Sequence, residues 1–431
     1  MDRQILQLDV GASYRLEMKP IASSTFGEIW AAERCETGEL VAIKQVRRDK
    51  MREAPPQLRH LWVDGLSREI DFLDGHRNCH LVTLLRRGEL DGLPVMVLER
   101  MECSLAAFLD PKRQPGNRLD LMIVVEWLRQ ITEGIGVIHR AGLRHLDLKP
   151  DNLLLGEASQ LGRKIKIADL GTSLATTSWN HIFAGTPGWQ PREQFFPLRR
   201  EGMIFYYETY PSSDFFALGL LLFFLLTGRQ TCFARECVSL HAREQEYAAW
   251  TRRESPPPGF TETDRRVLLE ALGVSSLTTD GHEEGPFVVE HTGGDHGEDT
   301  LVGDEQGGGT LVPGLVGGDY EADTIAPGLV GGNYEADTIA PGLVDNDYEE
   351  GPFVPGLVGG PLLASSPARE ILALMETLLA DSPEERPQST AEILDRLAII
   401  KERISRLPLK PEPVRNIPSG WRFPRWFRKT D

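Results

Sequence analysis

The chain has 431 residues, 26% of them charged and 41% hydrophobic, a composition typical of a globular protein with room for two or three domains. Its net charge of −17 comes from one segment, because residues 275 to 368 hold 18 of the 64 acidic residues and no Lys or Arg. The other residues carry 46 acids against 47 bases, so the charge gives no reason to expect nucleic acid binding.

Two patterns in the first quarter of the chain predict a strand and then a helix. Residues 40–46 alternate as in a strand and follow a predicted turn at residues 36–38. Further along, Leu66, Ile70 and Leu73 recur at helical spacing and place Glu69 on the same helix. Taken alone, Glu69 fits a solvated helix face better than a functional role.

The segment His145-Leu-Asp-Leu-Lys-Pro-Asp-Asn152, followed by Asp169-Leu-Gly171, carries the most chemical information. Moving a phosphoryl group requires oxygen ligands for Mg²⁺, a carboxylate for the attacking hydroxyl and cations for the phosphate oxygens. Asp169 and Asn152 suit the metal, Asp147 suits the hydroxyl, and Lys149 suits the γ-phosphate. Since Asp and Asn are also common turn residues, this segment needs support from the rest of the chain.

That support comes from motifs that resemble those of protein kinases, in the same order along the chain. Val41-Ala-Ile-Lys44 resembles the third-strand motif, and Asp214-Phe-Phe-Ala-Leu-Gly219 resembles the helix whose Asp braces the catalytic loop. Glu193 resembles the Glu of the family's Ala-Pro-Glu motif, and Arg386 resembles the Arg, late in the chain, that pairs with this Glu. The Lys-Pro after Asp147 is similar to the Ser/Thr branch, and the whole resembles the eukaryotic-like Ser/Thr protein kinases of bacterial type.

The resemblance implies an α+β, bilobal protein kinase-like fold. We expect an N-terminal extension at 1–13 and a kinase domain at 14–404. The domain divides into a β-rich N-lobe at 14–98 and a helical C-lobe at 101–404. ATP and Mg²⁺ are the implied cofactors, with adenine against the hinge near Glu99 and Met101. Lys44, oriented by Glu69, would hold the α- and β-phosphates, and Asp147 would accept the proton of a Ser or Thr on a protein substrate.

The loop that covers the phosphates departs most from the family pattern, Gly-x-Gly-x-x-Gly. Two of its three glycines are replaced by Ala22 and Ser24, so only Gly27 remains for close backbone approach. The replacement predicts weaker nucleotide binding or a loop held farther from the phosphates, although three hydroxyl donors remain. The expected nucleotide-contacting residues of this loop are Ile21, Ala22, Ser23, Ser24, Thr25, Phe26, Gly27 and Ile29.

The second departure is Leu146, which replaces the Arg of the family's His-Arg-Asp. In kinases switched by phosphorylation of the activation loop, that Arg binds the phosphate. We therefore predict activity that does not depend on phosphorylating this loop. Leu170 replaces the usual Phe beside the metal ligand Asp169, and His145 is expected to be a packed structural residue. Since the polar groups of the reaction are intact, the sequence favours an active enzyme. A pseudokinase scaffold and a small-molecule phosphotransferase remain the alternatives.

Residues 275–365 form an acidic insertion rich in Gly and Pro, with a fourteen-residue repeat that begins at Pro313 and recurs at 327–340. Its composition predicts disorder and the role of a solvating spacer. The alternative is a phosphorylation site, because Thr324 and Thr338 lie in identical Glu-Ala-Asp-Thr-Ile-Ala contexts that a phosphothreonine-reading partner could bind. A predicted helix at 263–272 lies on its N-terminal side, and another at 369–379 on its C-terminal side.

The C-terminal tail, 405–431, reverses the charge. Residues 421–429 interleave four cations with four aromatics, which suits a membrane surface, stacking on nucleic acid or docking on the protein itself. The longest apolar run, 215–226, is too short to span a bilayer, so no transmembrane segment is expected. The N-terminus lacks a secretion signal and the five cysteines show no pairing pattern, so the sequence predicts reduced thiols and a cytoplasmic protein.

Overall fold

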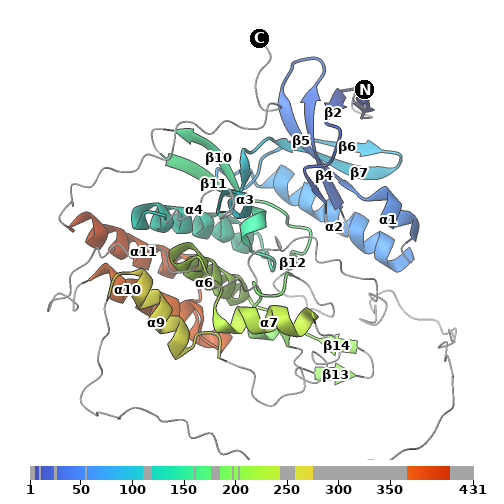
Figure 1. Ribbon diagram of the computed structural model, residues 1–431. Coiled ribbons are helices and arrows are strands. Elements are labelled where there is room, and N and C mark those ends of the chain that lie inside the picture. The colour runs from blue at the N-terminus through green and yellow to red at the C-terminus, as the bar shows by residue number, and fades with distance from the viewer. Residues whose placement is uncertain are drawn as a thin grey trace, which may run out of the picture.

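The structure is a computed structural model that shows a β-rich lobe beside a helical lobe (Figure 1). The expected bilobal α+β architecture is therefore confirmed. The described residues are 5–8, 11–23, 27–53, 56–109, 119–159, 162–175, 185–196, 199–201, 204–242, 258–274 and 366–407. The acidic insertion, Thr324, Thr338, Ser24, Thr25, Phe26 and the tail segment 421–429 lie outside them.

An antiparallel sheet forms the first lobe. Its strands run in the order β1-β2-β4-β5-β7-β6, and β3 pairs with β4. The strands are β1 (Ile5–Gln7), β2 (Ser13–Leu16), β3 (Ala22–Ser23), β4 (Gly27–Arg34), β5 (Leu40–Val46), β6 (Leu84–Leu90) and β7 (Leu93–Glu99). Helices α1 (Arg48–Glu53) and α2 (Pro56–Gly75) follow β5. Side chains alternate along a strand, so Lys44 shares the face of β5 on which Ala42 and Val46 pack against α2 residues.

The sheet begins earlier than the sequence predicted, because β1 lies inside the expected extension 1–13 and pairs with β2. Leu6 and Leu8 alternate with Gln7, so both enter a second core on the other face of the sheet. There they join Tyr14, Val41 and Val97, among other apolar residues. The strand β1, inside the expected extension, thus packs on the first lobe.

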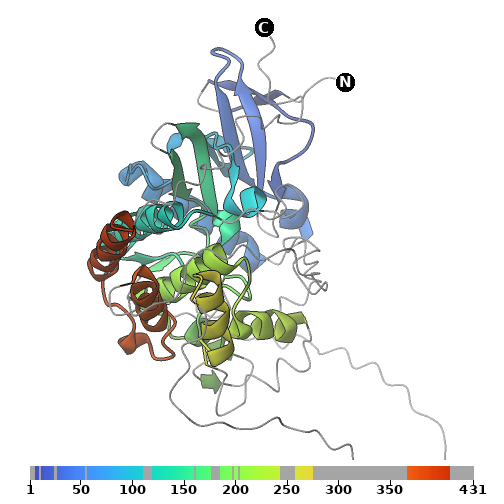
Figure 2. The ribbon, with the colours of Figure 1, turned by 60° about the vertical axis from the view of Figure 1, so that its left-hand side comes forward.

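The second lobe is built around α6 (Pro211–Thr227), which is buried along most of its length. Contacts join α6 to α4, α9 and α10, and α11 packs on both α4 and α10, as the two views show (Figures 1 and 2). The other helices of this lobe are α3 (Leu105–Leu109), α4 (Leu121–Arg140), α5 (Arg192–Phe195), α7 (Cys232–Ala242), α9 (Glu262–Ala271), α10 (Pro367–Leu378) and α11 (Thr390–Ser405). Among the described residues, no single helix has the length and hydropathy to cross a membrane. One pair bent by 110°, Pro211–Thr227 with Cys232–His241, meets that test by length and composition only.

Short strands and turns complete the helical lobe and carry its polar loops. They are β8 (Cys103–Ser104), β9 (Leu143–Arg144), β10 (Leu153–Ser159), β11 (Gly162–Ile167), β12 (Leu174–Ala175), β13 (Arg199–Glu201), β14 (Ile204–Tyr206) and the 3-10 turns η1 (Pro150–Asn152) and η4 (Pro383–Glu385). The hairpin β10–β11 lies between residues 145–152 and Asp169. Because its two strands are antiparallel, with Leu153 opposite Ile167, it brings Asn152 back toward Asp169.

The helices predicted on either side of the insertion are both present. The first, α9, is capped by Thr261, whose hydroxyl accepts the Asp264 N–H while the Asp264 carboxylate accepts the Thr261 N–H. Ser366 caps α10 by accepting the Arg369 N–H. Since α9 and α10 contact each other and α6, the insertion leaves and rejoins the lobe at one helical layer.

Candidate active site

A cluster of three charged side chains joins the two lobes. Lys44 Nζ on β5 lies 2.7 Å from Glu69 Oε2 on α2 and 2.7 Å from Asp169 Oδ1. Glu69 therefore contacts Lys44 as the sequence predicts. Its side chain is buried and does not lie on a solvated helix face. Burial alone would lower the pKa of Lys44, but Asp169 and Glu69 raise that pKa above its ordinary value. Lys44 is therefore a firmly charged ammonium, as phosphate binding requires.

The catalytic loop, residues 145–152, places two polar groups, those of Lys149 and Asn152, around the Asp147 carboxylate. Lys149 Nζ lies 3.1 Å from Asp147 Oδ2. Asn152 donates through Nδ2 to the Asp147 carbonyl at 2.8 Å and to Asp147 Oδ2 at 3.1 Å. Burial lowers the pKa of Lys149, but the charge and hydrogen bond of Asp147, together with the charges of Asp169 and Asp151, outweigh it and the net shift is upward. The carboxylate of Asp147 and the ammonium of Lys149 thus lie side by side.

The carboxylate of Asp214 on α6 binds the backbone of the catalytic loop. It accepts the backbone N–H groups of His145 and Leu146 at 2.8 Å each, and it contacts His139 Nε2 at 2.8 Å. These bonds hold Leu146 in the left-handed region at φ +65°, which is costly for a residue with a Cβ. The brace expected of Asp214 is therefore present, and it fixes the backbone directly before Asp147.

His145 is the packed structural residue that the sequence predicted. It is fully buried, its Nδ1 accepts the Asp147 N–H at 3.2 Å, and its Nε2 lies 3.2 Å from the Ala168 carbonyl. The Asp147 contact makes Nδ1 the acceptor, so the ring proton belongs on Nε2, where it can donate to Ala168. The ring therefore ties the catalytic loop to the residue before Asp169.

Asp169 and Asn152 fit the ligand set of a divalent metal. The Asp169 side chain remains 44% exposed although Lys44 contacts its Oδ1, and Asn152 uses its Nδ2 in the bonds to Asp147, which leaves Oδ1 for a metal. Burial raises the pKa of the Asp169 carboxyl, but Lys44 and Lys149 hold that pKa well below its usual range, so it is ionised. One carboxylate and one amide oxygen suffice where phosphates supply further ligands.

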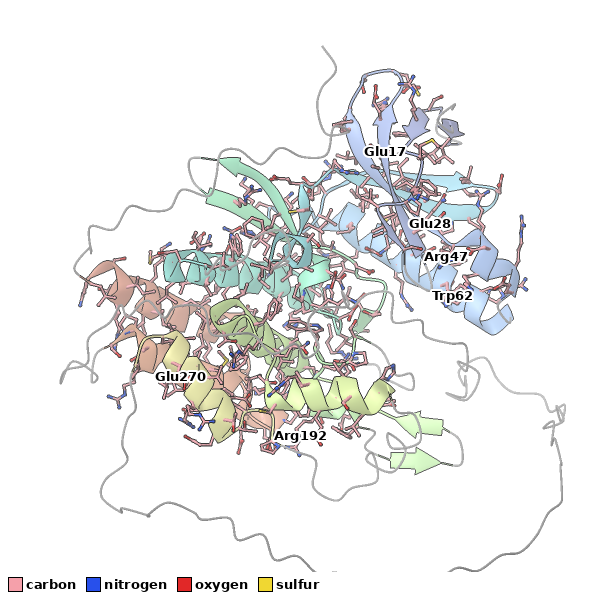
Figure 3. The ribbon with its side chains drawn as sticks, viewed as in Figure 1. Glu17, Glu28, Arg47, Trp62, Arg192 and Glu270 are labelled. Atoms are coloured by element: carbon pink, nitrogen blue, oxygen red, sulfur yellow. The ribbon has the colours of Figure 1, made fainter. Side chains whose placement is uncertain are left out.

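Among the phosphate-loop residues, Ile21, Ala22, Ser23, Gly27 and Ile29 are described. Ala22 and Ser23 form β3 opposite Ile29 and Glu28 of β4, and Ile21 is exposed. A Cβ on Gly27 would lie 3.3 Å from the Gln45 carbonyl, so this glycine permits close packing of β4 on β5. Glu28, labelled in Figure 3, accepts a 2.6 Å bond from Gln45 Nε2 at the same place.

At the hinge, the Glu99 carboxylate is turned toward the helical lobe. It binds the Lys166 ammonium and accepts the Thr83 N–H at 2.6 Å. Met101 lies over the hairpin, with its Cε 3.8 Å from the position of a Cβ on Gly156. The Glu99 side chain is thus engaged by β11, and a nucleotide at this hinge would meet the backbone of Glu99 and Met101.

The end of the activation segment, residues 169–193 where described, is anchored by a buried ion pair. Arg386 donates to Glu193 through Nη1 at 2.6 Å and Nη2 at 2.9 Å, and Ser213 Oγ donates to Glu193 at 2.7 Å. The neighbouring Arg192, labelled in Figure 3, pairs with Asp381 at 2.6 Å. The pairing of Glu193 with Arg386 expected from the sequence is confirmed.

Thr186 was not among the residues assigned from the sequence. Its Oγ1 donates to Asp147 Oδ1 at 2.7 Å and accepts from Lys149 Nζ at 2.6 Å, so it bridges the base and the cation. Gly185, at φ +101°, permits this, because a Cβ there would lie 2.6 Å from the Leu146 carbonyl. The Gly-Thr pair was the available signal, but only the fold brings Thr186 to Asp147.

Two lobes joined by Lys44, Glu69 and Asp169, with a braced catalytic loop below them, define the class of proteins with a protein kinase fold. Residues 17–396 match the protein kinase domain, and the chain belongs to that family.

Three curated relatives are kinases or cell division control proteins. The chain is 30% identical over 166 residues to cell division control protein 2 homolog 1 of Trypanosoma brucei brucei, covering 38% of this chain and 50% of that protein. It is 29% identical over 213 residues to CBL-interacting protein kinase 19 of Oryza sativa subsp. japonica, covering 48% and 38%. It is 30% identical over 168 residues to cell division control protein 2 homolog D of Antirrhinum majus, covering 38% and 51%. The matches thus span about half or less of these relatives.

Proposed function

We propose that this protein transfers the γ-phosphoryl group of ATP to Ser or Thr hydroxyls of protein substrates, with Mg²⁺ as the metal. The observation that carries the proposal is the position of Lys44, which binds Glu69 and Asp169 at 2.7 Å each. This places a phosphate-binding cation next to a metal-binding carboxylate, and the two must act on the same nucleotide.

Each group then has one task. Lys44, held by Glu69, binds the α- and β-phosphates, while Asp169 and Asn152 hold the metal. When bound, Mg²⁺ offsets the charge on the phosphate oxygens. Asp147 accepts the proton of the attacking hydroxyl, and Lys149, at 3.1 Å from Asp147, binds the γ-phosphate oxygens as charge develops on them.

The direct test is transfer from γ-labelled ATP to a generic Ser/Thr protein substrate. The Asp147→Asn variant keeps the shape of the site and removes the base, so labelling should fall by about a hundredfold or more. The control is Asp64→Asn, an exposed position on α2. Equal labelling by wild type and Asp147→Asn would refute the enzyme and support the alternative, a pseudokinase that presents its acidic repeats or basic tail to partners.

The same active site offers its own chain as a second substrate. Thr324 and Thr338 share the context Glu-Ala-Asp-Thr-Ile-Ala, and we extend the proposal to their autophosphorylation and recognition by a phosphothreonine-reading partner. Thr324 follows Val274, the last described residue before the insertion, by 50 residues. A chain of that length has a root-mean-square span of about 40 Å, comparable to the size of the catalytic domain.

Mass spectrometry after incubation with Mg-ATP tests this extension, with the Asp147→Asn protein as control. Transfer within one molecule predicts a rate per molecule that does not change with protein concentration. Unmodified Thr324 and Thr338 in an active preparation would exclude it and leave the spacer role for the insertion. Membrane-surface binding by residues 421–429 is a separate proposal, which sedimentation with anionic vesicles, with and without residues 420–431, decides. The cytoplasmic location stays a prediction.

A further inference from the structure

The catalytic loop is preceded by an arginine, Arg144, that the proposed reaction does not use. Its side chain is among the largest fully buried ones in the described structure. Nη1 donates to the Thr209 Oγ1 at 2.8 Å and also to the Thr209 carbonyl, and Nη2 donates to the Ala175 carbonyl at 2.5 Å. One guanidinium thus joins two segments that are far apart in the sequence.

Both segments matter for the site. Ala175 follows Asp169 by six residues in the activation segment, and β12 pairs with β9 through Leu174 opposite Arg144 and Ala175 opposite Leu143. Thr209 lies five residues before Asp214, the brace of the catalytic loop. Arg144 therefore connects the beginning of the activation segment (β12 in Figure 1) to the approach of α6, the residues just before its N-terminus.

The chemistry of arginine explains why this residue stands here. Burial lowers the pKa of Arg144, which the charge of Asp214 partly counters, but a guanidinium stays protonated in proteins. Its desolvation must then be offset by the bonds it makes. The planar fork presents donors in two directions at once, which the single ammonium of lysine does not.

The position that usually binds an activation-loop phosphate offers no such donor, because Leu146 is buried and apolar. At Leu146 the segment is held by neutral bonds: Gln194 Nε2 donates to its carbonyl at 2.5 Å, beside the tightly packed Gly185. Of the hydroxyls that an activating phosphate could modify, those of Thr172, Ser173, Thr176, Thr177 and Ser178, the structure describes two. Ser173 is buried, and the Thr172 hydroxyl lies 3.3 Å from the His145 carbonyl.

We propose that Arg144 is a positioning residue that clamps the start of the activation segment to the approach of α6, in the place of a phosphate-dependent contact. This rests on the proposed function for its effect on rate, while the clamp itself is a property of the protein without nucleotide. The segment is then held in its working position from the moment the protein folds, without a modifying enzyme.

The test is backbone amide exchange of the full, nucleotide-free protein at residues 170–175. Arg144→Met and Arg144→Lys should both speed exchange there by about tenfold or more, while exchange in α4 stays as in wild type. Arg140→Met, at the exposed end of α4, is the matched control and should change neither region. Unchanged exchange at 170–175 in folded Arg144→Met overturns the clamp, and full restoration by Lys overturns the role of the fork.

Steady-state kinetics provide the second measurement. For a protein substrate, kcat should fall by about tenfold or more in Arg144→Lys while the KM for ATP stays within about threefold, because Lys44 and its partner Glu69 lie on β5 and α2 of the other lobe. If the KM for ATP rose by the same factor as kcat fell, the whole active site would be loosened, and the positioning role of Arg144 would be overturned. If wild type transfers no phosphate, the proposed function fails, but the exchange result still decides the clamp.

A milder variant decides the matter if the Arg144 variants do not fold. Thr209→Val removes one acceptor of Arg144 and keeps the shape of the side chain. It should speed exchange at 170–175 by about threefold or more, and no change would overturn the proposal.

Discussion

Thr186→Val removes the hydroxyl that bridges Asp147 and Lys149 while keeping the shape of the side chain. The bonds are 2.7 Å to Asp147 Oδ1 and 2.6 Å from Lys149 Nζ, both to charged groups. A hydrogen bond to a charged group contributes about 1.5–3 kcal/mol. If one such contribution acts in the transition state, kcat/KM for a Ser substrate should fall by about 10- to 150-fold.

The assay is steady-state phosphate transfer to a Ser peptide at saturating Mg-ATP, with the KM for ATP measured separately. Thr186→Ser keeps the hydroxyl and serves as the control, with an expected kcat/KM within about threefold of wild type. The KM for ATP should change little, since Lys44, Glu69 and Asp169 are untouched. A Thr186→Val enzyme that matches Thr186→Ser would refute the assignment of Thr186 to the reaction geometry.

Four further outcomes are expected. Glu193→Gln leaves Arg386 buried beside a neutral group and should lower the free energy of unfolding by about 3–5 kcal/mol in urea denaturation. A loss below about 1 kcal/mol would contradict this. Lys166→Met frees the Glu99 carboxylate at the hinge and should raise the KM for ATP more than it lowers kcat; the reverse pattern would argue against a hinge role. The Arg129 side chain is the main cause that lowers the pKa of Glu126 to about 2, so the stabilisation by Glu126 is present above about pH 4.5 and is lost as the pH falls toward 2. The cost of Glu126→Gln, about 1 kcal/mol for a partly exposed pair, should therefore shrink between pH 6 and pH 3, and a constant cost would contradict the pairing. Simultaneous replacement by Ala of the five hydroxyl residues in the activation loop should leave activity intact. Loss of activity in a folded protein would refute the prediction that activity does not depend on phosphorylation of this loop. The five residues are Thr172, Ser173, Thr176, Thr177 and Ser178.

The sequence predicted two long-range ion pairs because their residues lie in motifs that resemble those of protein kinases. Lys44 with Glu69 and Glu193 with Arg386 are far apart along the chain, and no local periodicity would join them. The resemblance supplied the pairing, and the structure places the atoms in contact. Local patterns alone gave the strand at 40–46 and the helix that carries Glu69.

What the sequence could not supply depends on tertiary contacts. The strand β1 is only three residues long, so its alternation was too short to predict a strand, and its burial follows from pairing with β2. The roles of Thr186 and Arg144 depend on partners at least 37 and 31 residues away, respectively. Such hydrogen bonds leave no trace in composition or spacing.

The second core beneath the sheet also bears on how the protein assembles during synthesis. Its residues run from Leu6 to Val97, so the small lobe can close this core once the first hundred residues have left the ribosome. The Glu193–Arg386 pair, which anchors the activation segment, needs 289 more residues after Val97. At about 5–20 residues per second that interval lasts about 15–60 s. The core of the first lobe can thus form before the catalytic site is complete, since the anchor of the activation segment waits until Arg386 has been made.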